Sequence, residues 1–266
     1  MVDRLSEIEA YYDAVPRSAA RAEAIGPFTL FVKIGPGWSY YARPSLSATR
    51  FTEAEVQAVR ARQRALGVPE AFEWVADTTP NLAEPAAAAG LEVTRFPLML
   101  LHDFQRVQPD GVYIRHATAD DDLALVDAVG HVSFNNPGTA VGAAGVDAAR
   151  LSIRPDAPAV AFQQERLRAG RTVTGVAFVD GQLVGIGSHQ PVGSVTEIVG
   201  VGVLPAFRRR GIAAAITSHL VADALQRGVR TVFLSAGDET IGRVYARVGF
   251  VRIATACTAE PAVPHS

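Results

Sequence analysis

The sequence predicts a mixed α/β fold in which an antiparallel sheet leads into a helix–strand–helix–strand segment. Two β-rich runs within residues 172–190 are joined by Asp180-Gly181, a dipeptide that accepts the positive φ of a tight hairpin turn. Apolar residues then recur at helical spacing from Ile212 to Leu225, and Gly228 is placed to end that helix. The first hundred residues show the same order of helix, strand, helix and strand.

The second half begins with a strand over residues 111–117. Thr118, with Asp121 three residues on, is expected to cap a helix over 123–129, and the Gly-, Asn- and Pro-rich segment 131–146 reads as a loop. The elements that follow are helices over 148–153 and 158–169, strands over 172–179, 182–190 and 195–204, a helix from 212, a strand over 231–236, a helix over 239–248 and a strand over 250–257. The tail "TAEPAVPHS" is expected to be loose.

The first half contains a helix opened by a Thr52/Glu55 capping box and closed by Gly67. A strand over 71–76, a short helix ending at Gly90 and a strand over 91–101 follow. Aligning Gly67 with Gly228 and Gly90 with Gly249 matches the element order of the two halves, with glycine spacings of 23 and 21 residues. We interpret this as two related halves, the first incomplete, although ordinary α/β regularity would give the same match. The segment 106–111 is the expected boundary.

Composition narrows the class of protein. The 266 residues are 48% hydrophobic and 20% charged, as in soluble globular proteins, and the formal net charge of −2 gives no overall bias toward nucleic acid or anionic membranes. Cys257 is the only cysteine, which excludes an intramolecular disulfide and a cysteine-cluster metal site. The N-terminus is acidic where a signal peptide needs an apolar core, and no apolar run approaches the roughly 20 residues of a membrane span. We expect a cytoplasmic protein that binds neither membranes nor metals.

The stretch "VGVLPAFRRRGIAAAI" places three arginines and a glycine between a strand and a helix. The first amides of a helix lack internal partners, and Gly211 would let the backbone approach a phosphate closely. This context favours an anion site over a solvated basic turn. Neither "GVGVLP" nor "GIGSHQ" has the strand–turn–helix context of a dinucleotide fingerprint, and the sequence contains no P-loop motif.

Residues 208–213, "RRRGIA", satisfy the [QR]-x-x-G-x-[GA] signature of the GNAT superfamily of acyl-CoA-dependent N-acyltransferases, and Val203-Leu204-Pro205 precede it as in that family. "VYARVGF", residues 244–250, resembles the family's late Y-x-[RK]-x-GF motif. The resemblance covers roughly residues 112–257 and implies a GNAT fold, a central, mostly antiparallel twisted sheet flanked by helices. Residues 1–106 resemble the degenerate first repeat of tandem members, since Ala86 stands where Tyr245 stands and the arginine–glycine loop is missing. The domains implied are 1–106 and a catalytic 112–259, with 260–266 as a loose tail.

The resemblance also implies site residues. The amides of residues 208–213 would hold the pyrophosphate of coenzyme A, and the strand backbone before them would contact the thioester and pantetheine arm. The cofactor-binding residues implied are Val201, Gly202, Val203, Arg208, Arg209, Arg210, Gly211, Ile212, Ala213 and Asp238. Asp238 stands where many members carry an asparagine. Gly200 and Gly202 also suit a strand bulge or, alternatively, close packing of a helix on the sheet.

Tyr245 matches the position that protonates the departing thiolate, although a tyrosine there could equally be a core residue. Glu197 is the candidate general base, with an exposed strand-end glutamate as the alternative, and His189 and His131 are weaker candidates. Cys257 is not expected to be a nucleophile, because His265 in the tail is its only histidine neighbour in sequence.

These expectations describe an acetyl-CoA-dependent N-acetyltransferase that acts on a small-molecule amine by direct attack through a tetrahedral intermediate. The sequence leaves open a non-catalytic acyl-CoA-binding module, and also a homodimer. A nucleic-acid-binding protein is disfavoured, because the arginines are not interleaved with aromatic residues.

Overall fold

The chain forms two compact units in the computed structural model, which describes residues 2–37, 39–154 and 156–262. Unit 1 holds the described residues of 1–98 and 253–266, and unit 2 holds those of 99–252. Two long strands, β5 (Leu91–Leu101) and β11 (Phe250–Pro261), each pass from one unit into the other. Residues 253–259, which the sequence placed with the second half, lie in unit 1, because β11 pairs antiparallel with β4 (Phe72–Val75).

Unit 1 is a small mixed sheet with its own apolar core. Its strands run in the order β1-β2-β3-β4-β11, and Phe28, Phe72 and Trp74 are among the fully buried side chains of the core. Its other elements are α1 (Val2–Ala14), η1 (Val15–Ser18), β1 (Ala20–Ile25), β2 (Phe28–Lys33), β3 (Ala42–Pro44), α2 (Glu53–Leu66), η2 (Pro80–Leu82) and α3 (Ala83–Ala88).

Unit 2 contains the larger core and all the predicted site residues. Its strands run in the order β10-β9-β8-β7-β6, antiparallel except for the parallel pair β9 and β10. The elements are β6 (Tyr113–His116), α4 (Leu123–Phe134), α5 (Val146–Leu151), α6 (Ala157–Arg168), β7 (Val173–Val179), β8 (Gln182–Val192), β9 (Val195–Val203), η3 (Pro205–Phe207), α7 (Ile212–Gln226), β10 (Thr231–Ser235) and α8 (Glu239–Ala246).

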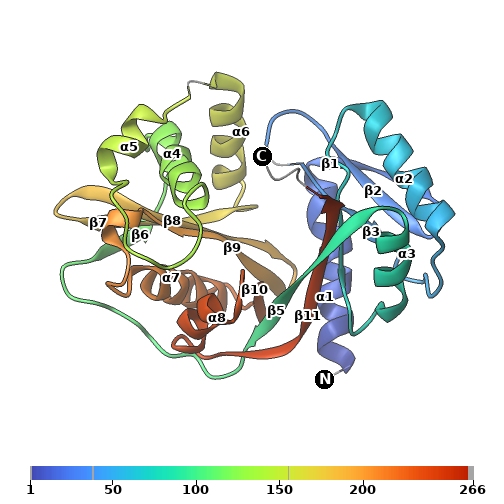
Figure 1. Cartoon of the computed structure of the whole chain (residues 1–266). Coiled ribbons are helices and arrows are strands. Elements are labelled where there is room, and N and C mark those ends of the chain that lie inside the picture. The colour runs from blue at the N-terminus through green and yellow to red at the C-terminus, as the bar shows by residue number, and fades with distance from the viewer. Residues whose placement is uncertain (1, 38, 155, 263–266) are drawn as a thin grey trace. The chain divides into compact units, whose positions relative to one another are not determined.

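Helices cover both faces of the unit 2 sheet, and small residues in β8 and α4 allow them to approach closely. A Cβ added at Gly187 would lie 2.8 Å from Ile216 Cγ2 of α7, so this glycine faces α7. Ile186, its neighbour in the strand, points to the opposite face, where its Cδ1 lies 2.8 Å from a Cβ added at Gly130 of α4. Figure 1 shows α4, α5 and α6 on one side of these strands and α7 with α8 on the other.

The mixed α/β class and most of the predicted elements are confirmed. The hairpin turn carries positive φ at both Asp180 (50°) and Gly181 (74°), and the Thr52/Glu55 capping box is present with both reciprocal hydrogen bonds. Gly67, Gly90, Gly228 and Gly249 all have positive φ at or just after the ends of their helices.

Three local predictions are wrong. The cap of α4 is Asp122, whose carboxylate accepts from Leu125 N at 3.0 Å, whereas Thr118 N donates to Asp121 in a separate turn. α4 also continues four residues into the expected loop, to Phe134. The expected loose tail is in part ordered, because β11 runs to Pro261; residues 263–266, including His265, lie outside the described residues.

The sequence reading did not identify α1 or the first three strands of unit 1. Among the described residues, no helix is both long enough and apolar enough to span a membrane.

Candidate active site

Strand β9 separates from its parallel neighbour β10 after only three residues. Val195, Thr196 and Glu197 pair with Thr231, Val232 and Phe233, and the register goes no further. On its other edge, β9 carries two residues, Gly200 and Val201, opposite the single residue Gly187 of β8. This two-against-one pairing is a β-bulge. The part of β9 from Ile198 to Val203 therefore has no recorded strand pairing with β10 in the described chain.

Glycine is required at the two positions in β9 for different structural reasons. Gly200 has φ of 63°, which a residue with a Cβ adopts at a cost, and a Cβ there would meet nothing within 4 Å. A Cβ added at Gly202 would instead lie 2.8 Å from Ser133 Cβ, at the end of α4. Gly200 thus belongs to the bulge and Gly202 to close helix–strand packing, so both sequence interpretations apply, each to one residue.

The turn after β9 leads into the open N-terminus of α7. Arg209 and Gly211 both have positive φ, 66° and 77°, and Gly211 is the N-cap of the helix. No side chain caps α7, and the first of its amides with a recorded partner inside the helix is that of Ala215, which donates to Gly211 O at 3.0 Å. Amides without helical partners at the positive end of a 15-residue helix are groups of the kind that bind anions.

The three arginines of the turn differ in what their side chains do. Arg209 and Arg210 are exposed, and the Arg210 guanidinium carbon lies 5.9 Å from the centre of the Phe207 ring. Arg208 is half-buried, and burial lowers the pKa of its guanidinium. Its side chain donates to backbone carbonyls of Val203, Ser133, Asn136 and Ala140. The sequence suggested that this side chain helps to bind phosphate, but in the structure it is engaged by the protein's own carbonyls.

Tyr245 lies on α8 and is 8% exposed. Burial raises the pKa of its phenol to about 12, so the hydroxyl keeps its proton at neutral pH. The ring makes an edge contact with Phe250, with ring centroids 6.4 Å apart. No hydrogen bond of the hydroxyl is recorded among the described residues. A protonated hydroxyl without a protein partner suits a proton donor.

Asp238, predicted to contact the pantetheine arm, is the N-cap of α8. Its Oδ1 accepts from Ile241 N at 2.7 Å, and its side chain is exposed. The capping role explains an aspartate here, because Asp and Asn both serve well as N-caps.

The candidate bases lie in three environments. Glu197 is half-buried at the last β9 position paired with β10, where the two strands part. His189 is fully buried between Thr196 Oγ1 at 3.1 Å and Asp223 Oδ2 at 2.9 Å, and burial lowers its pKa. His131 is exposed on α4, with Nε2 2.9 Å from Asn135 Nδ2. Glu197 alone combines partial exposure with a place at the strand opening.

Cys257 lies in unit 1, fully buried in that unit's core, and burial raises the pKa of its thiol. A buried thiol with a raised pKa is a poor nucleophile.

The helix of unit 1 that corresponds in order to α7 has a closed N-terminus. At α2, Glu55 N donates to Thr52 Oγ1 at 3.3 Å, and Thr52 N donates to Glu55 Oε2 at 2.8 Å. Glu53 adds a second acidic residue to the first turn. The chain's own carboxylates thus occupy the position that α7 leaves open.

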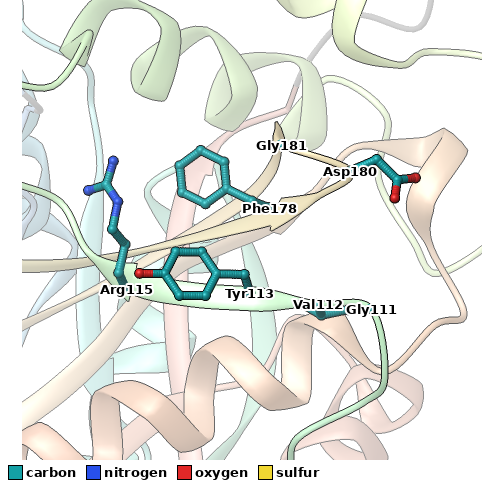
Figure 2. Close-up of a pocket in the computed structure, with 7 residues that line it drawn as sticks. All are labelled: Gly111, Val112, Tyr113, Arg115, Phe178, Asp180 and Gly181. Carbon is teal, nitrogen blue, oxygen red and sulfur yellow. The ribbon is translucent and has the colours of Figure 1, made fainter.

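A shallow cavity of about 520 Å³ lies on the edge of unit 2, lined by residues of β6 and of the β7–β8 turn (Figure 2). Arg115 is its one cationic lining residue, and it forms an ion pair with Asp121 at 2.5 Å and stacks 5.1 Å from the Phe178 ring centre. The lining includes none of the predicted site residues. The guanidinium of Arg115 is thus already engaged by Asp121.

One comparison with known proteins gives a match that lies within unit 2. Residues 144–250 match the model of the acetyltransferase (GNAT) family. No curated protein gives a significant match. Among solved structures, a GCN5-related N-acetyltransferase from Kribbella flavida has a TM-score of 0.72 and 22% identity, covering 98% of this chain and 96% of its own.

Two further structures are similar over most of the chain. A putative GNAT-family acetyltransferase from Novosphingobium aromaticivorans has a TM-score of 0.55 and 17% identity, with 91% and 92% coverage. A tandem GNAT protein from the clavulanic acid biosynthesis pathway has a TM-score of 0.52 and 18% identity, with 90% and 79% coverage. At these identities the likeness concerns the fold. Residues 144–250 thus match the acetyltransferase (GNAT) family model, and the fold of the chain is similar to that of GCN5-related N-acetyltransferases of known structure.

Proposed function

We propose that the protein transfers an acetyl group from acetyl-CoA to the amine of a small molecule, with the reaction site in unit 2. The observation that carries the proposal is the open N-terminus of α7, which comes one short turn after a strand that separates from its parallel neighbour. Amides of residues 209–213 would hold the pyrophosphate, since the amide of Arg208 already donates to Pro205 O at 3.3 Å. The exposed side chains of Arg209 and Arg210 would add positive charge.

The residues of β9 would position and polarise the reacting carbonyl. The backbone of Val201, Gly202 and Val203 lies in the part of the strand that β10 does not pair. An amide near Val201 or Gly202 would donate to the oxyanion that forms when the amine attacks the thioester.

Glu197 and Tyr245 would move the two protons. Glu197 would accept the proton of the ammonium, directly or through water, which leaves a neutral amine as the nucleophile. Tyr245 would give its proton to the thiolate when the carbon–sulfur bond breaks. The attacking nitrogen, positively charged after it adds to the carbonyl, would lose its surplus proton to solvent, and the phenolate would regain one from solvent. The net change is the exchange of an acetyl group for a proton between thiol and amine, with no acyl-enzyme.

Unit 1 would not bind acyl-CoA at the equivalent position. Its α2 is capped by Thr52 and Glu55, and a negative carboxylate there would repel a pyrophosphate. In this proposal one cofactor site therefore serves the whole chain.

The first test is calorimetric titration of acetyl-CoA into the wild type, Gly211→Asp and Gly228→Asp. Both substitutions place an aspartate at a positive-φ glycine flanking α7, at 77° and 81°, so they match in charge and backbone strain and differ in the end of the helix. We expect micromolar-range binding by the wild type, about −8 kcal/mol, and by Gly228→Asp, with loss in Gly211→Asp.

Equal binding by all three proteins would show that the pyrophosphate does not bind at the N-terminus of α7. No binding by the wild type would refute the proposed function. A non-catalytic acyl-CoA-binding module is the alternative. It would bind acetyl-CoA and depend on Gly211, but release no coenzyme A thiol with any amine.

A further inference from the structure

The turn that opens α7 is joined to a distant loop along its whole length. The glycine-rich loop, defined here as residues 133–145, comprises the end of α4 and the segment before α5. Gly142 N donates to Pro205 O at 3.2 Å, and Ala206 N donates to Ala144 O at 3.0 Å. These two bonds tie the second half of the glycine-rich loop to η3.

Arg208 ties the first half of the same loop. Its Nη2 donates to Ser133 O at 3.1 Å and Asn136 O at 2.5 Å, and its Nη1 donates to Ala140 O at 3.3 Å. Nε donates to Val203 O at 3.1 Å, at the end of β9. One guanidinium thus joins the strand end, the end of α4 and the loop, over about 70 residues of sequence.

The position of the glycine-rich loop matters because it borders the proposed reaction centre. Ser133 Cβ would lie 2.8 Å from a Cβ at Gly202, and Phe134 Cε2 would lie 3.8 Å from it. The Phe134 side chain is 58% exposed, so an aromatic surface faces solvent beside the backbone proposed to polarise the thioester. A shift of this loop would therefore change the surroundings of the attacking amine.

We propose that Arg208 is a positioning residue, whose backbone belongs to the phosphate-binding turn and whose side chain holds the glycine-rich loop beside the reaction centre. The inference rests on the proposed function. It makes pyrophosphate binding and loop order interdependent, because both constrain the same turn. The inference also means that the glycine-rich loop, and not the arginine cluster, would surround the amine that accepts the acetyl group.

Lysine at position 208 separates this role from phosphate binding. Arg208→Lys keeps the positive charge, but a single ammonium has three donors on a flexible stem and cannot reproduce a fork to four carbonyls. Arg168→Lys is the control, since Arg168 is exposed in the last turn of α6 and belongs to neither site.

The measurement is amide hydrogen exchange of the full chain with and without acetyl-CoA, with calorimetry on the same samples. In the wild type and Arg168→Lys, acetyl-CoA should slow exchange in peptides covering 133–145 by about 10-fold. In Arg208→Lys, these peptides should exchange about 10-fold faster without ligand, and acetyl-CoA should bind within about threefold of the wild type without slowing them. A 10-fold change corresponds to about 1.4 kcal/mol.

Two results would overturn the inference. One is unchanged loop exchange in Arg208→Lys together with weaker acetyl-CoA binding, which would make Arg208 a phosphate ligand. The other is wild-type binding of acetyl-CoA with no protection of residues 133–145, a result that stands even if Arg208→Lys does not fold. Absence of wild-type binding would refute the proposed function instead, and the exchange rates of the ligand-free proteins would still decide whether Arg208 holds the loop.

Discussion

The contact between β9 and α4 gives a quantitative prediction for Gly202→Ala. The new Cβ would lie 2.8 Å from Ser133 Cβ, about 1 Å inside the usual carbon–carbon contact of roughly 3.5–4.0 Å. Ser133 and Gly202 are both buried, and the overlap involves the Ser133 Cβ rather than the end of a flexible side chain. Either α4 or β9 must therefore shift. Overpacking of this kind destabilises proteins by about 1–3 kcal/mol.

Ser133→Gly tests whether that overlap is the cause. The Ser133 hydroxyl donates only within its own helix, to Val129 O at 2.7 Å, so its removal leaves no partner in the sheet unsatisfied. Glycine inside a helix costs about 1 kcal/mol. In the double variant Gly202→Ala/Ser133→Gly the overlap is absent, so most of the stability that it cost should be regained. The coupling free energy between the two substitutions should be about 1–2 kcal/mol.

Gly200 supplies the matched control in the same strand. Gly200→Ala has open space but must hold φ of 63°, at a cost of about 1–2 kcal/mol. Its effect should be additive with that of Ser133→Gly, and Gly200→Asn should be milder because asparagine tolerates this region.

Urea unfolding of the variants gives the free energies for both cycles. If Gly202→Ala and Ser133→Gly are additive within about 0.5 kcal/mol, the close approach is not what requires glycine at position 202.

Two further predictions concern protons. Tyr245→Phe should lower kcat at pH 7 by about 100-fold while acetyl-CoA binding is kept, because general acids contribute roughly 10²–10⁴-fold; an unchanged kcat would remove the phenol from the mechanism. Burial lowers the pKa of His189 and of His219, and the nearby His116 lowers that of His219 further. As the pH falls past the ordinary histidine pKa of about 6.5, the unfolded chain therefore binds more protons than the folded one. The free energy of unfolding should therefore fall as pH drops from 7.5 to 5.5, by at most about 1.4 kcal/mol per pH unit for each histidine. His219→Gln should flatten the slope measured by urea unfolding, and an identical slope would exclude that residue as a contributor.

The parts of the fold that could be predicted are those with local causes. The Asp180-Gly181 turn, the Thr52 capping box and the helix ends at glycine depend on backbone preferences of a few adjacent residues, and all are present. The cap of α4, which is Asp122 and not the predicted Thr118, shows the limit of such local patterns. Asp121, three residues after Thr118, forms a hydrogen-bonded ion pair with Arg115 of β6 that lowers its pKa, and this pair belongs to a turn before the helix.

The elements missed in unit 1 depend on distant pairing. β1 reads "ARAEAI", a run of alanines and charged residues with no strand signal of its own, and it is a strand because it pairs with β2 from Ala20↔Lys33 to Ile25↔Phe28. The end of β11 is similar, since Ala256–Ala259 pair with residues 72–75 of β4, which lie far earlier in the chain. Sequence periodicity cannot report a partner at that distance.

Around the candidate site, the sequence predicted the backbone geometry better than the side-chain contacts. The open start of α7 and the glycines of β9 follow from local pattern, whereas the four carbonyls around Arg208 belong to segments that only folding brings together. A guanidinium beside a helix N-terminus suggests an anion ligand, and here the carbonyls satisfy it first. No feature of "RRRGIA" distinguishes Arg208 from its two exposed neighbours.

The helix starts of α2 and α7 differ in how their first amides are satisfied. α2 satisfies its first amides with Thr52 and Glu55, a device worth about 1 kcal/mol to a helix. α7 begins at Gly211 without a side-chain cap and so forgoes that stabilisation. A ligand phosphate would supply the missing acceptors, so occupancy of the site and order of the turn should rise together. Arg208 extends this dependence to the glycine-rich loop, because the same turn that leaves its amides open holds that loop through its side chain.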